Sequence, residues 1–262
     1  MEKISKSQVK LVKSLQLKKF RDELGLFVAE GDKCVSELAK AFELVHLYRE
    51  GGNASRTEIE QMSGLRTPQG TIAVFKKSPI SNLQSPISGL TLALDGVQDP
   101  GNLGTIIRTC DWFGVHDIFC SRDTADCYNP KVVQATMGAL SRVRIHYVDL
   151  PQWLSEISNL QSPISNLQSP IAIYGTLLDG RDMYDVLSSS RHNVIPSVIV
   201  MGNEGNGISP AVRALVTHPI RIPSYPKDGA SEHSGKNDET PAVIESLNVS
   251  IATAIVLAEF RR

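Results

Sequence analysis

Short apolar runs alternate with segments of helical periodicity along most of the chain. In the larger, C-terminal part, apolar runs predict strands at 90–95, 115–120, 143–148, 171–176, 197–201 and 219–222. Helical periodicity lies between most of them, at about 102–113, 129–140, 182–189, 209–216 and 247–260. Apolar strands that alternate with helices predict an α/β fold with a parallel sheet covered on both faces. Ligands of such sheets bind outside the carboxyl ends of the strands, so functional residues are expected there.

The N-terminal part predicts a separate, small α/β unit over residues 1–76. Its strands are expected at 26–30, 43–48 and 70–75, and its helices at 5–20, 32–41 and 56–63.

The heptapeptide SNLQSPI occurs three times, at 81–87, 158–164 and 165–171. A proline in every copy excludes a continuous helix. The first copy predicts a linker at 77–89, which would separate the N-terminal unit from a second domain at 90–262. We assign no function to the repeat.

The stretch LDGVQDPGNLGTIIRT (94–109) predicts a strand, a glycine-rich turn and a helix. It is neither a Walker A loop nor the dinucleotide motif G-x-G-x-x-G. Gly104, Thr105 and Arg108 are expected on one helix face, where the missing side chain of Gly104 would let a ligand or another chain approach. The alternative is a solvated arginine on a capped helix. The opposite, core-facing side is predicted to comprise Leu103, Ile106, Ile107 and Cys110.

Two later loops also carry polar groups. SVIVMGNEGNGISP (197–210) places Glu204 amid glycine-rich, flexible backbone at the end of a strand, where a carboxylate can accept from a hydroxyl, amino or guanidinium group. ESLNVSIATAIVLAEF (245–260) gathers Ser246, Asn248 and Ser250 at the start of a helix, either for capping alone or for chemistry. The buried stripe of this helix is predicted to be Ile251, Ala254, Ile255 and Ala258.

Charge is close to balanced in the 262 residues, with a formal net charge of −1, but it is unevenly distributed. Residues 1–21 hold seven Lys or Arg against one acidic residue. This patch could contact an anionic partner. It could equally be the solvated side of an amphipathic helix whose apolar side comprises Val9, Val12, Leu15 and Leu17.

Cysteine and histidine spacing argue against a metal site. The four cysteines show no zinc-ligand spacing and the six histidines no H-x-x-x-H pattern, so no metal is expected. Reduced, half-buried thiols indicate a cytoplasmic protein. No run of ~18 apolar residues or secretory signal occurs, so no membrane association is expected.

Together, NLGTIIRT (102–109), MGNEGNGIS (201–209) and IP…ESLNVSIA (222–223 and 245–252) resemble the SpoU–TrmH class of the SPOUT superfamily, RNA ribose 2′-O-methyltransferases. YNPKVVQATMGAL (128–140) matches the same family. The resemblance implies S-adenosylmethionine as methyl donor, a C-terminal trefoil knot, and a homodimer whose active site is completed across the interface. The N-terminal unit is similar to the small L30e-like RNA-binding domain that often precedes the catalytic one.

Carried over residue by residue, the resemblance implies three sets of site residues. The implied catalytic residues are Asn102, Arg108, Glu204, Ser246 and Asn248. The implied cofactor-binding residues are Thr176, Met201, Gly202, Asn203, Ile222 and Leu247. The implied RNA-binding residues are Lys131 and Arg108.

The implied reaction is attack of a ribose 2′-hydroxyl on the sulfonium methyl group, in rRNA or tRNA with rRNA slightly favoured. A guanidinium stays protonated, so we expect Arg108 to hold a phosphate and stabilise developing alkoxide charge rather than act as a base.

Several alternatives remain. An RNA-binding protein of the same fold without methyl transfer is the first, while an NAD-dependent oxidoreductase and a metal hydrolase lack their motifs. The polar insertion at 224–244 departs from the family pattern and is either inert or a lid.

Overall fold

The computed structural model describes residues 4–77, 89–158, 171–188, 196–225 and 246–262. The predicted linker, most of the SNLQSPI repeats and most of the 224–244 insertion lie outside these residues. The path between the last strand and the last helix also lies outside them, so the trefoil knot stays a prediction.

The C-terminal domain contains a six-stranded sheet in the order β6-β5-β4-β8-β7-β9. All five strand pairings are parallel, which confirms the predicted sheet. The strands are β4 (Leu90–Leu94), β5 (Asp117–Ser121), β6 (Arg144–Val148), β7 (Ala172–Asp182), β8 (Ser197–Met201) and β9 (His218–Arg221). β7 continues six residues beyond its predicted end and is irregular between Thr176 and Arg181.

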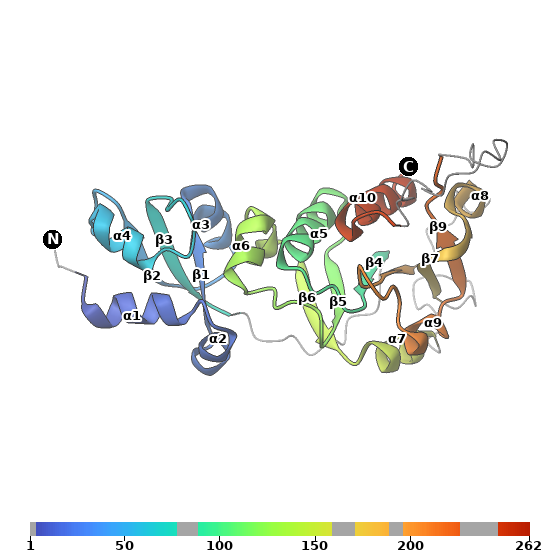
Figure 1. Ribbon diagram of the computed structural model, residues 1–262, viewed down its shortest axis with the longest axis horizontal. Helices are drawn as coiled ribbons and strands as arrows, with labels where there is room; N and C mark the ends of the chain where they lie inside the picture. Colours follow the sequence, from blue (N-terminus) through green and yellow to red (C-terminus); the bar gives the residue numbers. More distant parts are fainter. Residues whose placement is uncertain (1–3, 78–88, 159–170, 189–195, 226–245) are drawn as a thin grey trace, which may run out of the picture.

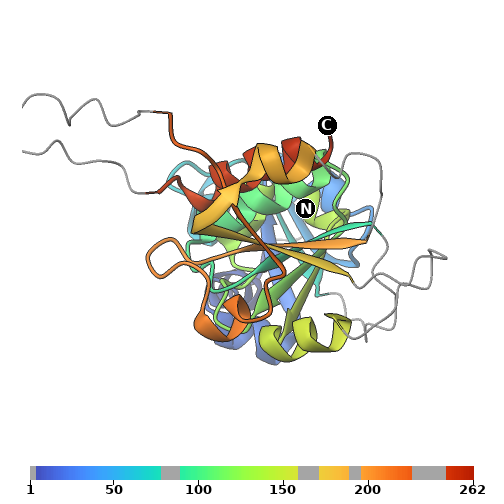
Figure 2. The same ribbon diagram turned by 90° about the vertical axis from the view of Figure 1, so that its right-hand side faces the viewer.

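Helices cover both faces of this sheet (Figures 1 and 2). One face carries α5 (Pro100–Trp112), α6 (Pro130–Thr136), α8 (Met183–Ser188) and α10 (Val249–Phe260). The other carries α7 (Leu150–Ser158), which the sequence analysis did not predict, and α9 (Pro210–Arg213). Successive side chains of β4 alternate between the two cores: Leu92 and Leu94 face α5, whereas Ala93 faces α7 and α9.

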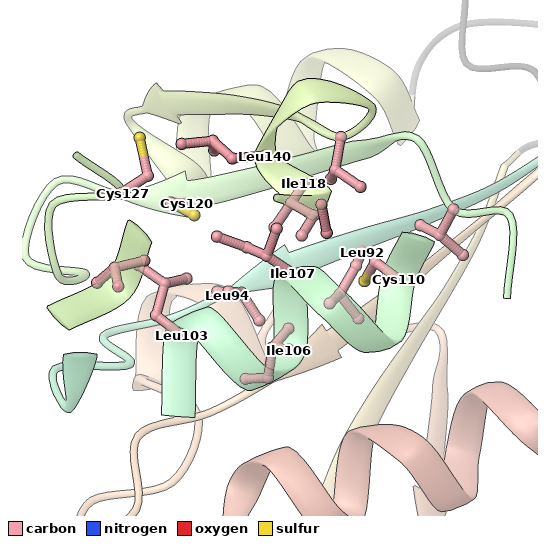
Figure 3. Close-up of a cluster of buried hydrophobic side chains, with 14 of the residues drawn as sticks. Leu92, Leu94, Leu103, Ile106, Ile107, Cys110, Ile118, Cys120, Cys127 and Leu140 are labelled. Carbon is pink, nitrogen blue, oxygen red and sulfur yellow. The ribbon is translucent and has the colours of Figure 1, made fainter. Parts of the chain in front are cut away.

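Helix α5 begins as the sequence indicates. Asp99 caps it by accepting a hydrogen bond from the backbone N–H of Asn102 at 2.8 Å, and Pro100 occupies the first turn. The predicted core-facing residues Leu103, Ile106, Ile107 and Cys110 are all fully buried (Figure 3).

The interpretation of Gly104 as a point of ligand approach is wrong. Gly104 is buried, and a Cβ there would lie 2.5 Å from the Cβ of Ala135 and 2.8 Å from the carbonyl oxygen of Val132. Both atoms belong to α6, so the missing side chain allows close packing of α5 against α6.

The predicted buried stripe of α10 is also wrong. Its buried residues are Val249, Ser250, Thr253, Val256 and Leu257. Ile251 is 53% exposed and Ala258 is exposed, while Ala254 and Ile255 are half-buried. The helix is apolar on nearly all sides, so periodicity alone does not determine which side packs inward.

The N-terminal unit has an antiparallel sheet in the order β1-β3-β2. Its strands are β1 (Leu26–Glu30), β2 (Leu44–Arg49) and β3 (Thr71–Lys76), and its helices are α1 (Lys6–Ser14), α2 (Lys18–Leu24), α3 (Asp32–Leu38) and α4 (Arg56–Met62). Residues on one face of this sheet pack with α1 and α4, and residues on the other face join the core of the C-terminal domain.

The single helix predicted at 5–20 is two helices, because Arg21 stabilises a break between them. The Nη1 of Arg21 donates to the carbonyl oxygens of Leu15 and Gln16 at 2.9 Å each. Its Nη2 and Nε donate to Asp126 Oδ2 of the C-terminal domain at 2.7 and 3.1 Å. Leu17, expected on the apolar side, is 60% exposed at this break.

The two domains pack directly on each other, with α6 between them (Figure 1). The helix predicted at 129–140 ends at Thr136, since Met137 and Gly138 both have positive φ, and a 3₁₀ turn follows at Ala139–Ser141. A Cβ on Gly138 would lie 2.5 Å from the Cβ of Glu37 in α3. Glycine at this position therefore lets the N-terminal unit approach closely.

All four cysteines are free and fully buried rather than half-buried. Burial raises the pKa of Cys34 to about 11 and that of Cys127 to about 12, so these thiols are packing groups. Within the part of the chain that the structure describes, no group of three or more His, Cys, Asp or Glu could hold a metal ion. No described helix combines the length and apolar character needed to cross a membrane.

The packing of Gly104 predicts the effect of a single methyl group. Gly104→Ala should lower the free energy of unfolding by about 1–3 kcal/mol, because the new Cβ overlaps α6. Urea unfolding checks this, with the exposed Thr105→Ala on the same helix as control, expected within about 0.5 kcal/mol of wild type. Equal stability of Gly104→Ala and wild type would contradict this account.

Candidate active site

Three of the predicted catalytic residues meet at the amino end of α5. Asn102 Nδ2 donates a hydrogen bond to Glu204 Oε1 at 2.8 Å. Asn248 Nδ2 donates to Asn102 Oδ1 at 2.9 Å. The three side chains come from the first turn of α5, the loop after β8 and the residue before α10. Asn102 therefore joins the first turn of α5 to two segments that are far away in the sequence.

The backbone N–H groups of α10 at one end of the cluster and the carboxylate of Glu204 at the other determine which group donates in each hydrogen bond. The Oδ1 of Asn248 caps α10 by accepting from the backbone N–H of Ser250 at 3.0 Å and of Ile251 at 3.4 Å. Its amide NH₂ must then face Asn102, whose own NH₂ faces Glu204. An ionised carboxylate only accepts hydrogen bonds, so this arrangement leaves no donor facing a donor.

The loop that carries Glu204 is held tightly, although its glycines predict a flexible backbone. Asn203 and Gly207 exchange two backbone hydrogen bonds of 2.9 Å, and Asn203 Oδ1 accepts from the N–H groups of Gly205 and Asn206. A Cβ on Gly202 would lie 2.3 Å from the carbonyl carbon of Gly207, so only glycine lets the loop close in this way. The position of Glu204 is thus set by the backbone around it.

Asp95, which the sequence analysis did not select, anchors the same loop. Asp95 is 8% exposed, and its Oδ2 accepts from the backbone N–H of Ser209 at 2.7 Å. The next residue, Gly96, accepts at its carbonyl from Asn203 Nδ2 at 2.7 Å. The available signal was a carboxylate directly after the apolar run 90–94, at the carboxyl end of a strand.

The predicted cofactor-binding residues lie near the carboxyl ends of β8 and β9, and on β7, which runs between these two strands. Thr176 Oγ1 donates to the carbonyl oxygen of Val200 at 3.1 Å, and Met201 ends β8. Ile222 follows β9 and is half-buried, and Leu247 precedes α10 and is 48% exposed. Apolar side chains that remain accessible beside polar backbone groups suit a ligand with a flat, apolar ring system.

The other predicted residues are not part of the cluster. Arg108 is exposed and forms no hydrogen bond or ion pair with any residue that the structure describes. It lies six residues after Asn102, which places it about 9 Å farther along α5 and about 120° around the helix axis. Ser246 is exposed two residues before Asn248, and Lys131 is exposed at the start of α6.

The capping role of Asn248 predicts how much this residue contributes to stability. Asn248→Ala should lower the free energy of unfolding by about 1 kcal/mol, because the α10 cap is lost. Asn248→Ser should recover most of that loss, since serine caps helices well but is too short to reach Asn102. Thermal unfolding of both variants measures this, and an equal loss in both would show that the cap is not the main contribution.

Comparisons with known proteins agree on one family. A model of the SpoU rRNA Methylase family matches residues 89–230, and a model of the MRM3-like substrate binding domain matches residues 6–54. The relatives include the 23S rRNA (guanosine(2553)-2′-O)-methyltransferase RlmP of Bacillus subtilis, 26% identical, with 100% of this chain and 98% of RlmP covered. The 23S rRNA (guanosine-2′-O-)-methyltransferase RlmB of Nitrosomonas europaea is 31% identical over 76% of this chain and 68% of its own.

Solved structures show the same similarity over nearly the whole chain. A Porphyromonas gingivalis protein described as an RNA methyltransferase of the TrmH family has a TM-score of 0.77 and 33% identity, with 99% of each chain covered. An AdoMet-bound rRNA methyltransferase from Sinorhizobium meliloti has a TM-score of 0.74 and 28% identity, covering 99% of this chain and 97% of its own. With a family model matched over more than half of its residues, the chain belongs to the SpoU rRNA methylase family, as its three loops predicted, and its class is that of S-adenosylmethionine-dependent RNA 2′-O-methyltransferases.

Proposed function

We propose that the protein methylates a ribose 2′-hydroxyl of ribosomal RNA, with the reaction at the cluster of Asn102, Glu204 and Asn248. The observation that carries this proposal is the fixed hydrogen-bond chain from α10 to Glu204. The similarity to RlmP and RlmB, which are named as 23S rRNA enzymes, favours rRNA over tRNA. A cytoplasmic location is part of the same proposal.

The residues at the strand ends fit the methyl donor. S-adenosylmethionine supplies an electrophilic methyl group on a sulfonium when bound. Ile222 and Leu247 offer apolar contacts for its adenine, while the tight loop of Gly202 and Asn203 presents backbone groups at the end of β8. Thr176 and Met201 lie beside this loop on neighbouring strands.

The polar residues suit the acceptor hydroxyl. Glu204 is exposed and has acceptor capacity beyond its bond to Asn102, so it can accept from the ribose hydroxyl and orient it. Holding the hydroxyl in line with the methyl group provides much of the acceleration. A guanidinium is a poor proton acceptor, so the contribution of Arg108 is to bind a phosphate and stabilise negative charge developing on the oxygen.

A second copy of the chain would bring Arg108 to the cluster. Thr105, Arg108 and Trp112 share the exposed face of α5, and Trp112 is 85% exposed. Helix α10, which packs on α5, adds Ile251 at 53% exposed. Exposed large apolar groups on adjacent helices are typical of a protein interface. A homodimer through these two helices covers this apolar surface and accounts for an arginine that its own chain does not engage.

Substitution of Arg108 tests the reaction. Arg108→Lys should lower kcat for transfer of labelled methyl groups to a 23S rRNA transcript by tenfold or more, because lysine keeps the charge but lacks the planar fork. Binding of S-adenosylhomocysteine should be unchanged. The matched control is Arg213→Lys, at an exposed arginine of α9 that pairs with Asp179 of β7. Near wild-type turnover in Arg108→Lys would overturn this role, and absence of transfer by the wild type to rRNA would overturn the proposed function.

The dimer proposal has a separate test. Ile251→Asp should shift the sedimentation coefficient at micromolar concentration from that of a dimer to that of a monomer, because a charge would be buried in the interface. Leu17→Asp, at a 60% exposed leucine of the N-terminal unit, should leave the dimer intact. A wild-type monomer, or a dimer unaffected by Ile251→Asp, would exclude the α5–α10 interface.

A further inference from the structure

A cavity of about 230 Å³ lies between the two domains, on the α6 side of α5. Gln16, Val28, Glu30 and Leu65 line it from the N-terminal unit. Pro100 of α5 and Lys131 of α6 are among the residues that line it from the C-terminal domain. This volume is below that of sites for drug-sized ligands, so it suits a single ring system.

The N-terminal wall contains a buried carboxylate with unused acceptor capacity. Glu30 is 4% exposed. Its Oε2 accepts from the hydroxyl of Ser63 at 2.5 Å, and its Oε1 accepts from the backbone N–H of Gly64 at 2.7 Å. A carboxylate offers about four acceptor positions, so each oxygen can accept one further hydrogen bond.

The same wall contains an amide donor without a partner. Gln16 Nε2 is buried and forms no hydrogen bond among the residues described. A Cβ on Gly64 would lie 2.6 to 2.8 Å from the amide atoms of Gln16, so glycine at this position makes room for the amide. A buried polar group without a partner is unfavourable, and a ligand with an acceptor would relieve that cost.

We propose that this cavity binds a guanine base of the RNA substrate. Guanine presents two adjacent donors, N1–H and N2–H, to which the Glu30 carboxylate is complementary. Its O6 and N7 acceptors match Gln16 Nε2 and the ammonium group of Lys131. Val28, Leu65 and Pro100 provide apolar contacts for the ring. Adenine and cytosine present only one exocyclic amino donor group, and uracil a single ring N–H, so guanine is the base that uses the whole set.

The guanine belongs to a nucleotide other than the methylated one. The cavity lies on the α6 side of α5, whereas Asn102 contacts Asn248 on the α10 side, and Figure 1 shows α6 and α10 on opposite sides of α5. Because the cavity and the amide of Asn102 face different sides of α5, we assign the base in the cavity and the methylated ribose to different nucleotides. This proposal rests on the proposed function, since it takes RNA as the ligand.

The two walls of the cavity are held in register by the buried ion pair between Arg21 and Asp126. Arg21 is 2% exposed, and its bonds to Leu15 and Gln16 fix the backbone that carries the Gln16 side chain. The cavity is therefore formed before RNA binds, which lowers the entropic cost of binding.

Nucleoside monophosphates serve as probes of the cavity. Isothermal titration of the full-length protein should give tighter binding of GMP than of AMP, CMP or UMP by about tenfold or more. Gln16→Leu and Glu30→Gln should each weaken GMP binding by about tenfold. Gln16→Leu should not lower Tm, because its Nε2 has no partner to lose. Glu43→Gln, at an exposed glutamate of the same domain, should bind GMP as wild type does.

Three results would overturn the proposal: no saturable GMP binding, equal affinity for all four nucleotides, or GMP binding that both cavity variants retain. Loss of GMP binding in Asn102→Ala but not in Gln16→Leu would place the base in the candidate active site and also exclude the cavity. Methyl transfer to the 23S rRNA transcript gives an independent readout, in which Gln16→Leu should raise KM and leave kcat unchanged. Wild type that binds GMP in the cavity but transfers no methyl group would refute the proposed function alone.

Discussion

The rest of the candidate site depends on the two hydrogen bonds that the side-chain amide of Asn102 forms. This amide accepts from Asn248 and donates to Glu204, partners that lie 146 and 102 residues away in the sequence. Each member of the chain is oriented by the next: the backbone N–H groups of α10 fix Asn248, which fixes Asn102. The residue that caps α10 thereby also helps to position the carboxylate of Glu204, through Asn102. The start of α10 must lie at one position on α5 for any of these groups to be oriented.

Helix α5 contacts the core of the sheet, α6 and the start of α10, each with a different side. Its apolar side is buried in the core of the sheet, Gly104 lets α6 pack against it, and Asn102 meets the start of α10. The remaining face carries Thr105, Arg108 and Trp112 and is exposed. One chain therefore orients Asn102, Glu204 and Asn248 but leaves Arg108, the proposed phosphate-binding cation, without a partner among the described residues.

The alternation of apolar runs predicted the strands and the parallel sheet, because burial on both faces leaves a clear signal in the sequence. The face of α10 was not predictable, since the helix is apolar on most sides and only its contacts decide which residues are covered. The break after α1 depends on Arg21 and Asp126, 105 residues apart, and local propensity contains no trace of such a pair. Asn102, Glu204 and Asn248 were selected by resemblance to a family, and no spacing in the sequence shows that they touch. At Gly104 the sequence correctly indicated that a side chain would not fit. The reason was wrong, because the neighbour is α6 and not a ligand.

The rigid docking of the N-terminal unit changes what that unit does for the enzyme. A domain on a flexible tether would raise the local concentration of RNA without fixing its register. Here Arg21 forms hydrogen bonds both to the turn before α2 and to Asp126 of the C-terminal domain. In addition, α3 packs directly against Gly138. The position of the interdomain cavity relative to Asn102 is consequently fixed by the packing of the two domains. RNA bound at both points has a fixed spacing between the base in the cavity and the ribose at Asn102. The choice of the methylated ribose then follows from its spacing to a neighbouring base as well as from its own contacts.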